Sequence, residues 1–104
     1  MEHLSFTYEG GTTEAHNAIV VGVVASGNLE VMIEPTPGDA ACRITIDSPA
    51  RGFDDVWSAV LADFFERVKL GGVRISINDV GATPAVVSLR LDQAVETFRS
   101  GAAP

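Results

Sequence analysis

One hydroxyl side chain lies in the middle of a stretch that otherwise has the composition of a β-hairpin. Ser26 is followed by Gly27 and Asn28, and runs rich in β-branched residues flank these three on both sides. A serine at a hairpin tip could be modified by another protein, because the neighbouring glycine has no side chain to block an approaching enzyme. It could equally be an ordinary turn residue, since Ser, Gly and Asn all favour turns. It does not suit a serine nucleophile, because no His or Asp lies nearby in the sequence to activate it.

The other residues that could do chemistry favour structural roles. His3 and His16 lack the paired spacing of metal ligands, and Cys42, the one cysteine, can form neither an internal disulfide nor a zinc-binding thiolate set. Asp54 and Asp55 are better explained as the first turn of a helix, where the helix dipole favours anions. The sequence therefore predicts no catalytic residue and no metal site.

Two strand-like runs surround Ser26. Residues 29–34 alternate apolar and polar side chains, which indicates a strand buried on one face. Residues 19–24 are apolar almost throughout, which predicts a strand covered on both faces or central in a sheet. Joined by a short link, the runs predict a hairpin whose turn register stays open. With Ser26–Gly27 at the turn centre the hydroxyl projects from the tip, whereas with Gly27–Asn28 at the centre it turns toward Leu29.

A resemblance to a known family is carried by three segments: VGVVASGNLEVMIEP (residues 21–35), NDVGATPAVVSLRLDQ (residues 78–93) and the opening MEHLSF. They are similar to the attachment-site segment, the second signature and the METLSF-type N-terminus of the acyl carrier (delta) subunits of biotin-independent malonate decarboxylase. The likeness covers nearly the whole chain, in order and at matching spacing. The acyl carrier (gamma) subunit of citrate lyase shares the serine–glycine hairpin more loosely.

The resemblance implies a carrier rather than a catalyst. Its attachment position falls on Ser26, which would bear 2'-(5''-phosphoribosyl)-3'-dephospho-CoA through a phosphodiester, and the terminal thiol of that group would carry acetyl and malonyl as thioesters. The implied partners are the acyl transferase and decarboxylase subunits and the holo-carrier synthase, a phosphoribosyl-dephospho-CoA transferase. Asn28 departs from the Asp that the family often has, which could alter recognition by the synthase but leaves the acceptor hydroxyl. A chain produced alone is expected to lack the group.

Two alternatives remain open. The first is the carrier subunit of citrate lyase, with the same chemistry at Ser26 but other partners and another acyl group. The full-length match, particularly GATPAVVSLRL, favours the malonate system over it. The second is a small binding or regulatory module without a covalent group, in which Ser26 is only a turn residue.

The segment of residues 79–84 is predicted as a connection between a strand and a helix. Thr83 can cap the helix, and Pro84 suits its first position. The helix start could also point backbone N–H groups at an anion, such as the phosphates of a prosthetic group. We favour the plain connection.

Periodicity predicts the remaining elements. Strands are expected at residues 4–8, at a sheet edge, and at residues 41–47 and 73–78. A helix is expected over residues 53–70, stopped by Gly71 and Gly72, and a second helix follows Pro84. The expected buried stripe of the first helix is Phe53, Val56, Trp57, Val60, Leu61, Phe64 and Val68, and that of the second is Val87, Leu91, Ala94, Val95 and Phe98.

These elements predict an α+β two-layer sandwich, with a mostly antiparallel sheet of 4–5 strands and two helices on one face. Residues 1–104 are expected to form a single domain, with 101–104 as a disordered tail. The net charge of −7 argues against nucleic-acid or membrane surfaces and suits docking on basic faces of partner enzymes. No signal peptide or membrane span is recognisable, so a cytoplasmic location is expected.

Overall fold

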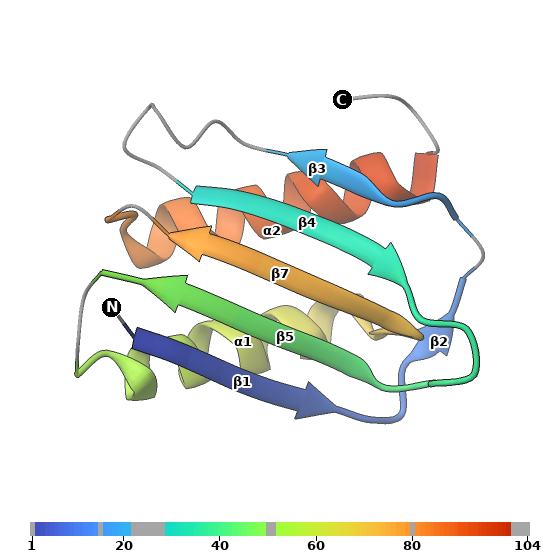
Figure 1. Cartoon of the computed structure of the whole chain (residues 1–104), viewed down its shortest axis with the longest axis horizontal. Helices are drawn as coiled ribbons and strands as arrows, with labels where there is room; N and C mark the ends of the chain where they lie inside the picture. The colour runs from blue at the N-terminus through green and yellow to red at the C-terminus, as the bar shows by residue number, and fades with distance from the viewer. Residues whose placement is uncertain (1, 15, 22–28, 50–51, 80, 101–104) are drawn as a thin grey trace.

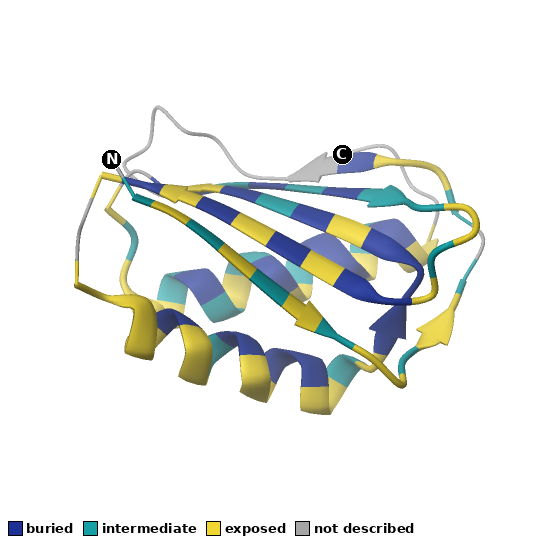
Figure 2. Ribbon diagram, turned by 60° about the horizontal axis from the view of Figure 1, so that its bottom comes forward, coloured by how far each residue is buried: buried dark blue, intermediate teal, exposed yellow. Residues whose placement is uncertain are grey.

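The computed structural model describes residues 2–14, 16–21, 29–49, 52–79 and 81–100. A five-stranded sheet forms one layer, and two helices cover one face of it (Figures 1 and 2). The strands follow the order β1 (Glu2–Tyr8), β5 (Cys42–Ser48), β7 (Val73–Asp79), β4 (Leu29–Pro35) and β3 (Ile19–Val21). The predicted α+β class, with both helices on one side, is confirmed.

The sheet is mixed, because one of its pairings is parallel. β1 with β5, β4 with β7 and β3 with β4 are antiparallel, whereas β5 and β7 run parallel. The helix α1 (Asp54–Val68) lies between β5 and β7 in the chain. A chain that crosses over through a helix returns to the sheet in the same direction, which explains the parallel pair.

The predicted hairpin is confirmed where the structure describes it, but the central position, one of the two expected for its first strand, is wrong. β3 pairs with β4 in register from Ile19 opposite Ile33 to Val21 opposite Val31. β3 is an edge strand, with β4 as its sheet neighbour, and does not lie centrally in the sheet. An apolar run cannot by itself distinguish a central strand from an edge strand, because a helix can cover the edge strand too. Here the helix α2 (Pro84–Ser100) packs against both β3 and β4.

The alternation of the strands separates a buried face from a polar one. Along β5 and β7 every second side chain is buried beneath the helices, and the side chains between them face away (Figure 2). β1 lies at an edge of the sheet, as predicted, and its apolar side chains are half-buried. The fully buried side chains with the largest volumes are Phe64, Phe98, Leu29, Ile33, Ile44, Ile46, Leu61, Leu70, Ile75, Ile77, Leu91 and Val31.

The helix α1 buries a shorter stripe than its periodicity predicts. Trp57 and Phe64 belong to the core, but Phe53 and Val56 are 50% and 41% exposed. The prediction failed at these two residues because periodicity identifies a face of a helix but not how far the sheet extends beneath it. The helix also ends earlier than expected, at Val68, because Lys69 adopts a left-handed conformation (φ 52°). The predicted stop at the glycines was therefore wrong.

Gly11 and Gly71 allow two backbone segments to approach each other closely. β6 (Leu70–Gly71) pairs in parallel with β2 (Thr12–Thr13), in a region that was predicted as a polar loop. A Cβ atom on Gly71 would lie 2.7 Å from the carbonyl oxygen of Ala40, and one on Gly11 would lie 2.8 Å from backbone atoms of residues 69–71. Only glycine fits at both positions, since backbone atoms cannot move aside cheaply.

The second helix agrees with the prediction. Pro84 is its first residue, and the backbone N–H of Val86 donates to Thr83 Oγ1 at 3.4 Å, a long capping hydrogen bond. Its buried residues are Val87, Leu91, Ala94, Val95 and Phe98.

Candidate functional site

The Ser26 segment lies outside the described residues, but both strands that lead to it are described. β3 is paired up to Val21 and β4 from Leu29 onward. Leu29 pairs with Asp79, the last residue of β7. Residues 22–28 therefore connect two strands at the end of the sheet where β5 and β7 finish and where both helices begin (Figure 1). We call this region the open end.

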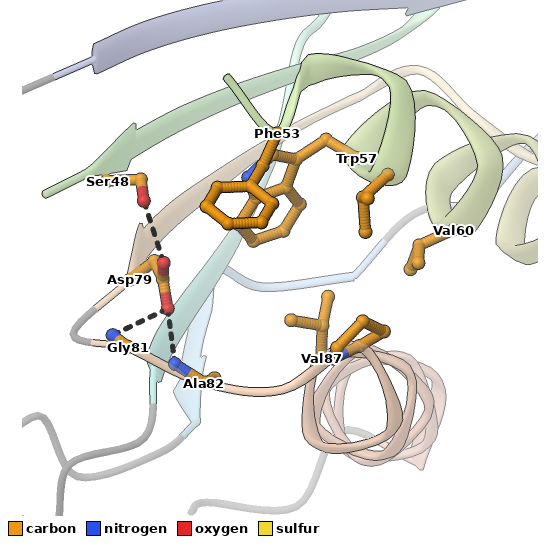
Figure 3. Close-up of a pocket in the computed structure, with 10 residues that line it drawn as sticks. Ser48, Phe53, Trp57, Val60, Asp79, Gly81, Ala82 and Val87 are labelled. Atoms are coloured by element: carbon orange, nitrogen blue, oxygen red, sulfur yellow. Dashed lines mark hydrogen bonds between the residues drawn. The ribbon is translucent and has the colours of Figure 1, made fainter. Parts of the chain in front are cut away.

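A buried carboxylate organises the open end. Asp79 is 6% exposed, and one of its oxygens accepts a hydrogen bond from Ser48 Oγ at 2.8 Å. The other oxygen accepts from the backbone N–H groups of Gly81 at 3.1 Å and Ala82 at 2.8 Å (Figure 3). Since Asp79 already takes these two N–H groups, they cannot bind a phosphate, and its negative charge would repel one. At Gly81 and Ala82 the structure therefore agrees with the plain connection that we favoured.

An apolar cleft opens between the first turns of α1 and α2. It has a volume of about 280 Å³. Figure 3 shows the side chains of Phe53, Trp57 and Val60 on the α1 side and Val87 on the α2 side, with Asp79 at one margin. The lining residues, which we call the cleft, are Ser48, Phe53, Val56, Trp57, Val60, Asp79, Gly81, Ala82, Pro84 and Val87.

Sequence reasoning missed this cleft. It assigned Phe53, Val56 and Trp57 together to the core, and the assignment holds for Trp57, which is 6% exposed. The position of Phe53 could have indicated the cleft, because Phe53 directly precedes the first helical residue, where a polar capping residue is usual. An aromatic residue at that point contributes no cap, which is a reason to look for another role.

Each of the two histidines contacts a carboxylate. His3 lies on β1 and its ring contacts the carboxylate of Asp47 on β5. His16 is part-buried, with Nε2 3.1 Å from a carboxylate oxygen of Glu14 and its ring edge-on to Phe98. Within the described ranges, no group of three or more His, Cys, Asp or Glu side chains could hold a metal ion.

Cys42 is fully buried at the start of β5. Burial raises the pKa of its thiol to about 12, because the apolar surroundings disfavour the thiolate. The thiol therefore stays protonated near neutral pH and is a poor nucleophile.

Comparisons with known proteins agree with one another. The sequence model of the malonate decarboxylase delta subunit (MdcD) family matches residues 16–98. The chain is 57% identical to the malonate decarboxylase acyl carrier protein of Stenotrophomonas maltophilia (strain R551-3), over 100% of both chains. It is 57% identical to that of Burkholderia cepacia, over 96% of this chain and 93% of the relative.

A solved structure agrees as well. A chain in the crystal structure of a Pseudomonas malonate decarboxylase hetero-tetramer in complex with malonate has a TM-score of 0.83 and 36% identity to this chain. The likeness covers 94% of this chain and 99% of that one.

The fold and the relatives define the class first: this is an acyl carrier subunit, which carries a group for other subunits and is not itself the catalyst. More closely, the chain belongs to the malonate decarboxylase delta subunit (MdcD) family. No described helix is long and apolar enough to cross a membrane.

Proposed function

We propose that the chain carries acyl groups in malonate decarboxylation on a phosphoribosyl-dephospho-CoA group esterified to Ser26 Oγ. The membership of the family supports the carrier role. The sequence similarity around the serine supports the residue, since residues 19–30 contain no other side-chain hydroxyl. When bound, the group supplies a terminal thiol that holds acetyl or malonyl as a thioester.

The strand register also supports Ser26. Each described pair of the hairpin, from Ile19 with Ile33 to Val21 with Val31, is centred on position 26 of the sequence. Ser26 is therefore the residue on which the described pairs are centred.

The described residues fit one part of such a group better than the other. The backbone N–H groups of Gly81 and Ala82 already donate hydrogen bonds to Asp79, so these two residues offer no phosphate site. The cleft is apolar, so it fits the uncharged thiol end of the arm. We therefore infer that the phosphates of the group stay in water.

We further propose that residues 1–104 act as one carrier domain in the cytoplasm. Its partners would be the acyl transferase and decarboxylase subunits, together with the synthase that attaches the group. The related Pseudomonas protein was crystallised as a hetero-tetramer, which supports a multi-subunit assembly. The net charge of −7 suits docking on basic partner surfaces.

Intact mass spectrometry tests the attachment. The chain is co-produced with the enzymes that build and attach the group, and its mass should rise by one phosphoribosyl-dephospho-CoA unit. Ser26→Ala should stay at the unmodified mass, whereas its free energy of unfolding should change by less than about 0.5 kcal/mol. A wild-type chain that remains unmodified would instead favour the non-covalent binding module.

A further inference from the structure

We propose that the cleft is a resting site for the acetyl-thioester end of the arm, and that it excludes the malonyl form. This inference deepens the proposed function and rests on it, because it requires an arm on Ser26. It assigns roles to Phe53, Val56 and Trp57 that the attachment chemistry alone does not require.

Chain length puts the cleft within reach. Ser26 lies three positions before Leu29, and a stretch of that length spans at most about 11 Å when fully extended. Leu29 pairs with Asp79, which lines the cleft. The arm consists of a phosphoribosyl unit, a nucleotide and pantetheine in series, which is longer than this gap. The arm can therefore return to the open end whatever path the connection takes.

The size and lining of the cleft suit the end of such an arm. Its volume of about 280 Å³ is slightly smaller than the range for small-molecule pockets, about 300–1,000 Å³. It therefore takes a fragment and not a whole cofactor. A methyl group, a thioester and the adjoining methylene carbons are uncharged and bury apolar surface favourably. Because the ligand is tethered, even weak contacts suffice, since the effective concentration reaches the millimolar range.

Charge around the cleft separates acetyl from malonyl. Malonyl ends in a carboxylate, which is costly to transfer into an apolar site without a cationic partner. Among the described residues that line the cleft, none is cationic and one, Asp79, is acidic. The carboxylate of Asp79 would repel the carboxylate of malonyl.

Phe53 gives independent support. It occupies the N-cap position of α1, makes no side-chain capping hydrogen bond and leaves half of its surface in water. Ser, Thr, Asp or Asn would serve the helix better at that position. A residue that neither caps the helix nor completes the core suits the mouth of a site. In this arrangement the acetyl thioester is sheltered from water, whereas the malonyl thioester stays free for a partner subunit.

Trp57 reports on the cleft directly, because it is the one tryptophan of the chain and lines the cleft. Its emission and its indole N–H resonance are recorded for the apo, acetyl-loaded and malonyl-loaded forms, each checked by intact mass. We expect the acetyl form to shift both signals, with emission moving to shorter wavelength, and the malonyl form to resemble the apo protein. Hydroxylamine should cleave the acetyl thioester severalfold more slowly on the protein than in free S-acetyl-pantetheine.

Matched variants test the lining. Phe53→Ser and Val56→Glu change half-exposed residues, so the fold should survive, as circular dichroism checks. Both should remove the Trp57 shift and the protection of the thioester. Leu89→Ser is the control, because Leu89 is 54% exposed on α2 and does not line the cleft. It should leave both signals as in the wild type.

The outcomes separate this inference from the proposed function. If Ser26 carries the expected mass but the Trp57 signals are equal in all three forms, the cleft does not bind the end of the arm, and the attachment to Ser26 still stands. If acetyl and malonyl shift the Trp57 signals equally, the cleft does not exclude the malonyl form. A Trp57 signal that depends on apo-protein concentration assigns the cleft to a second copy of the chain and overturns the proposal. Titration of the apo protein with free S-acetyl-pantetheine tests the cleft even if Ser26 proves unmodified, and an absence of any Trp57 response at millimolar concentration would count against it.

Discussion

The two ends of the sheet are built in opposite ways. At one end, which we call the closed end, β2 and β6 pair, and Gly11 and Gly71 bring two backbones into contact. Arg99 fastens the same end, since its guanidinium pairs with Glu14 and donates to the carbonyl of Val68 at 3.0 Å. At the open end an apolar cleft lies between the first turns of the two helices, and Phe53 remains half exposed.

The difference shows where stability and function are separated in a small domain. The closed end holds the sheet and helices together, and at Gly11 and Gly71 its contacts leave no room for an added atom. The open end, next to the Ser26 connection, leaves apolar surface uncovered, which a 104-residue chain would bury if stability were the sole requirement. The predictions below test this contrast, beginning with the largest effect.

The strongest contrast lies within α1. Phe64 is fully buried, whereas Phe53 is half exposed. Phe64→Ala should lower the free energy of unfolding by about 3–5 kcal/mol, because it leaves a cavity in the core. Phe53→Ala should cost about 1 kcal/mol or less. Urea denaturation of both variants measures the difference, and similar losses would mean that Phe53 belongs to the core after all.

Adding a single methyl group at the closed end should destabilise the protein. Gly71→Ala would place Cβ 2.7 Å from the carbonyl oxygen of Ala40, so we expect a loss of up to about 3 kcal/mol. Gly38→Ala is the control, because its φ of +85° costs about 1 kcal/mol of strain but no atom lies within 4 Å. Thermal unfolding ranks the two, and a Gly71→Ala variant as stable as Gly38→Ala would contradict the close approach.

The buried carboxylate should matter more than the exposed ones beside it. Asp79→Asn replaces one acceptor oxygen with an amide that cannot accept both from Ser48 and from the N–H groups of Gly81 and Ala82. We expect a loss of about 2 kcal/mol. Asp54→Asn, in the exposed first turn of α1, should cost at most about 1 kcal/mol through the helix dipole. Chemical denaturation compares them, and a neutral Asp79→Asn would remove the carboxylate from its organising role.

The smallest effect is electrostatic and depends on pH. Burial acts to raise the pKa of Glu14, but hydrogen bonds from Arg99 and His16 outweigh it and hold the pKa below its ordinary value. The ion pair therefore stabilises the fold above pH 4.5 or so, and this contribution disappears as the pH falls through the lowered pKa. Arg99→Gln should cost about 1 kcal/mol or less at pH 7, and less than that once the pH has fallen below the lowered pKa of Glu14, where the hydrogen bond to the Val68 carbonyl is what the variant still loses. A loss that is the same at every pH would mean that the Glu14 pair contributes nothing.

Most of the fold could be predicted from local patterns in the sequence. Alternation located the strands β1, β4, β5 and β7, and a Thr-Pro start located α2. Pairing that depends on distant residues was not predictable in the same way, which is why neither the edge position of β3 nor the β2–β6 pair was predicted. The exposure of Phe53 and Val56 also could not be read from periodicity, because it depends on where the sheet ends. The site prediction came from resemblance, and Ser26 remains a prediction.

The central claim is that Ser26 bears the carrier group, and one digestion tests it most directly. Cleavage after Glu14 and Glu30 releases residues 15–30, in which Ser26 is the sole side-chain hydroxyl. Mass spectrometry of the co-produced protein should find one phosphoribosyl-dephospho-CoA unit on this fragment and on no other, and none on the Ser26→Ala protein. The group on any other fragment, or on the Ser26→Ala protein, would contradict the account.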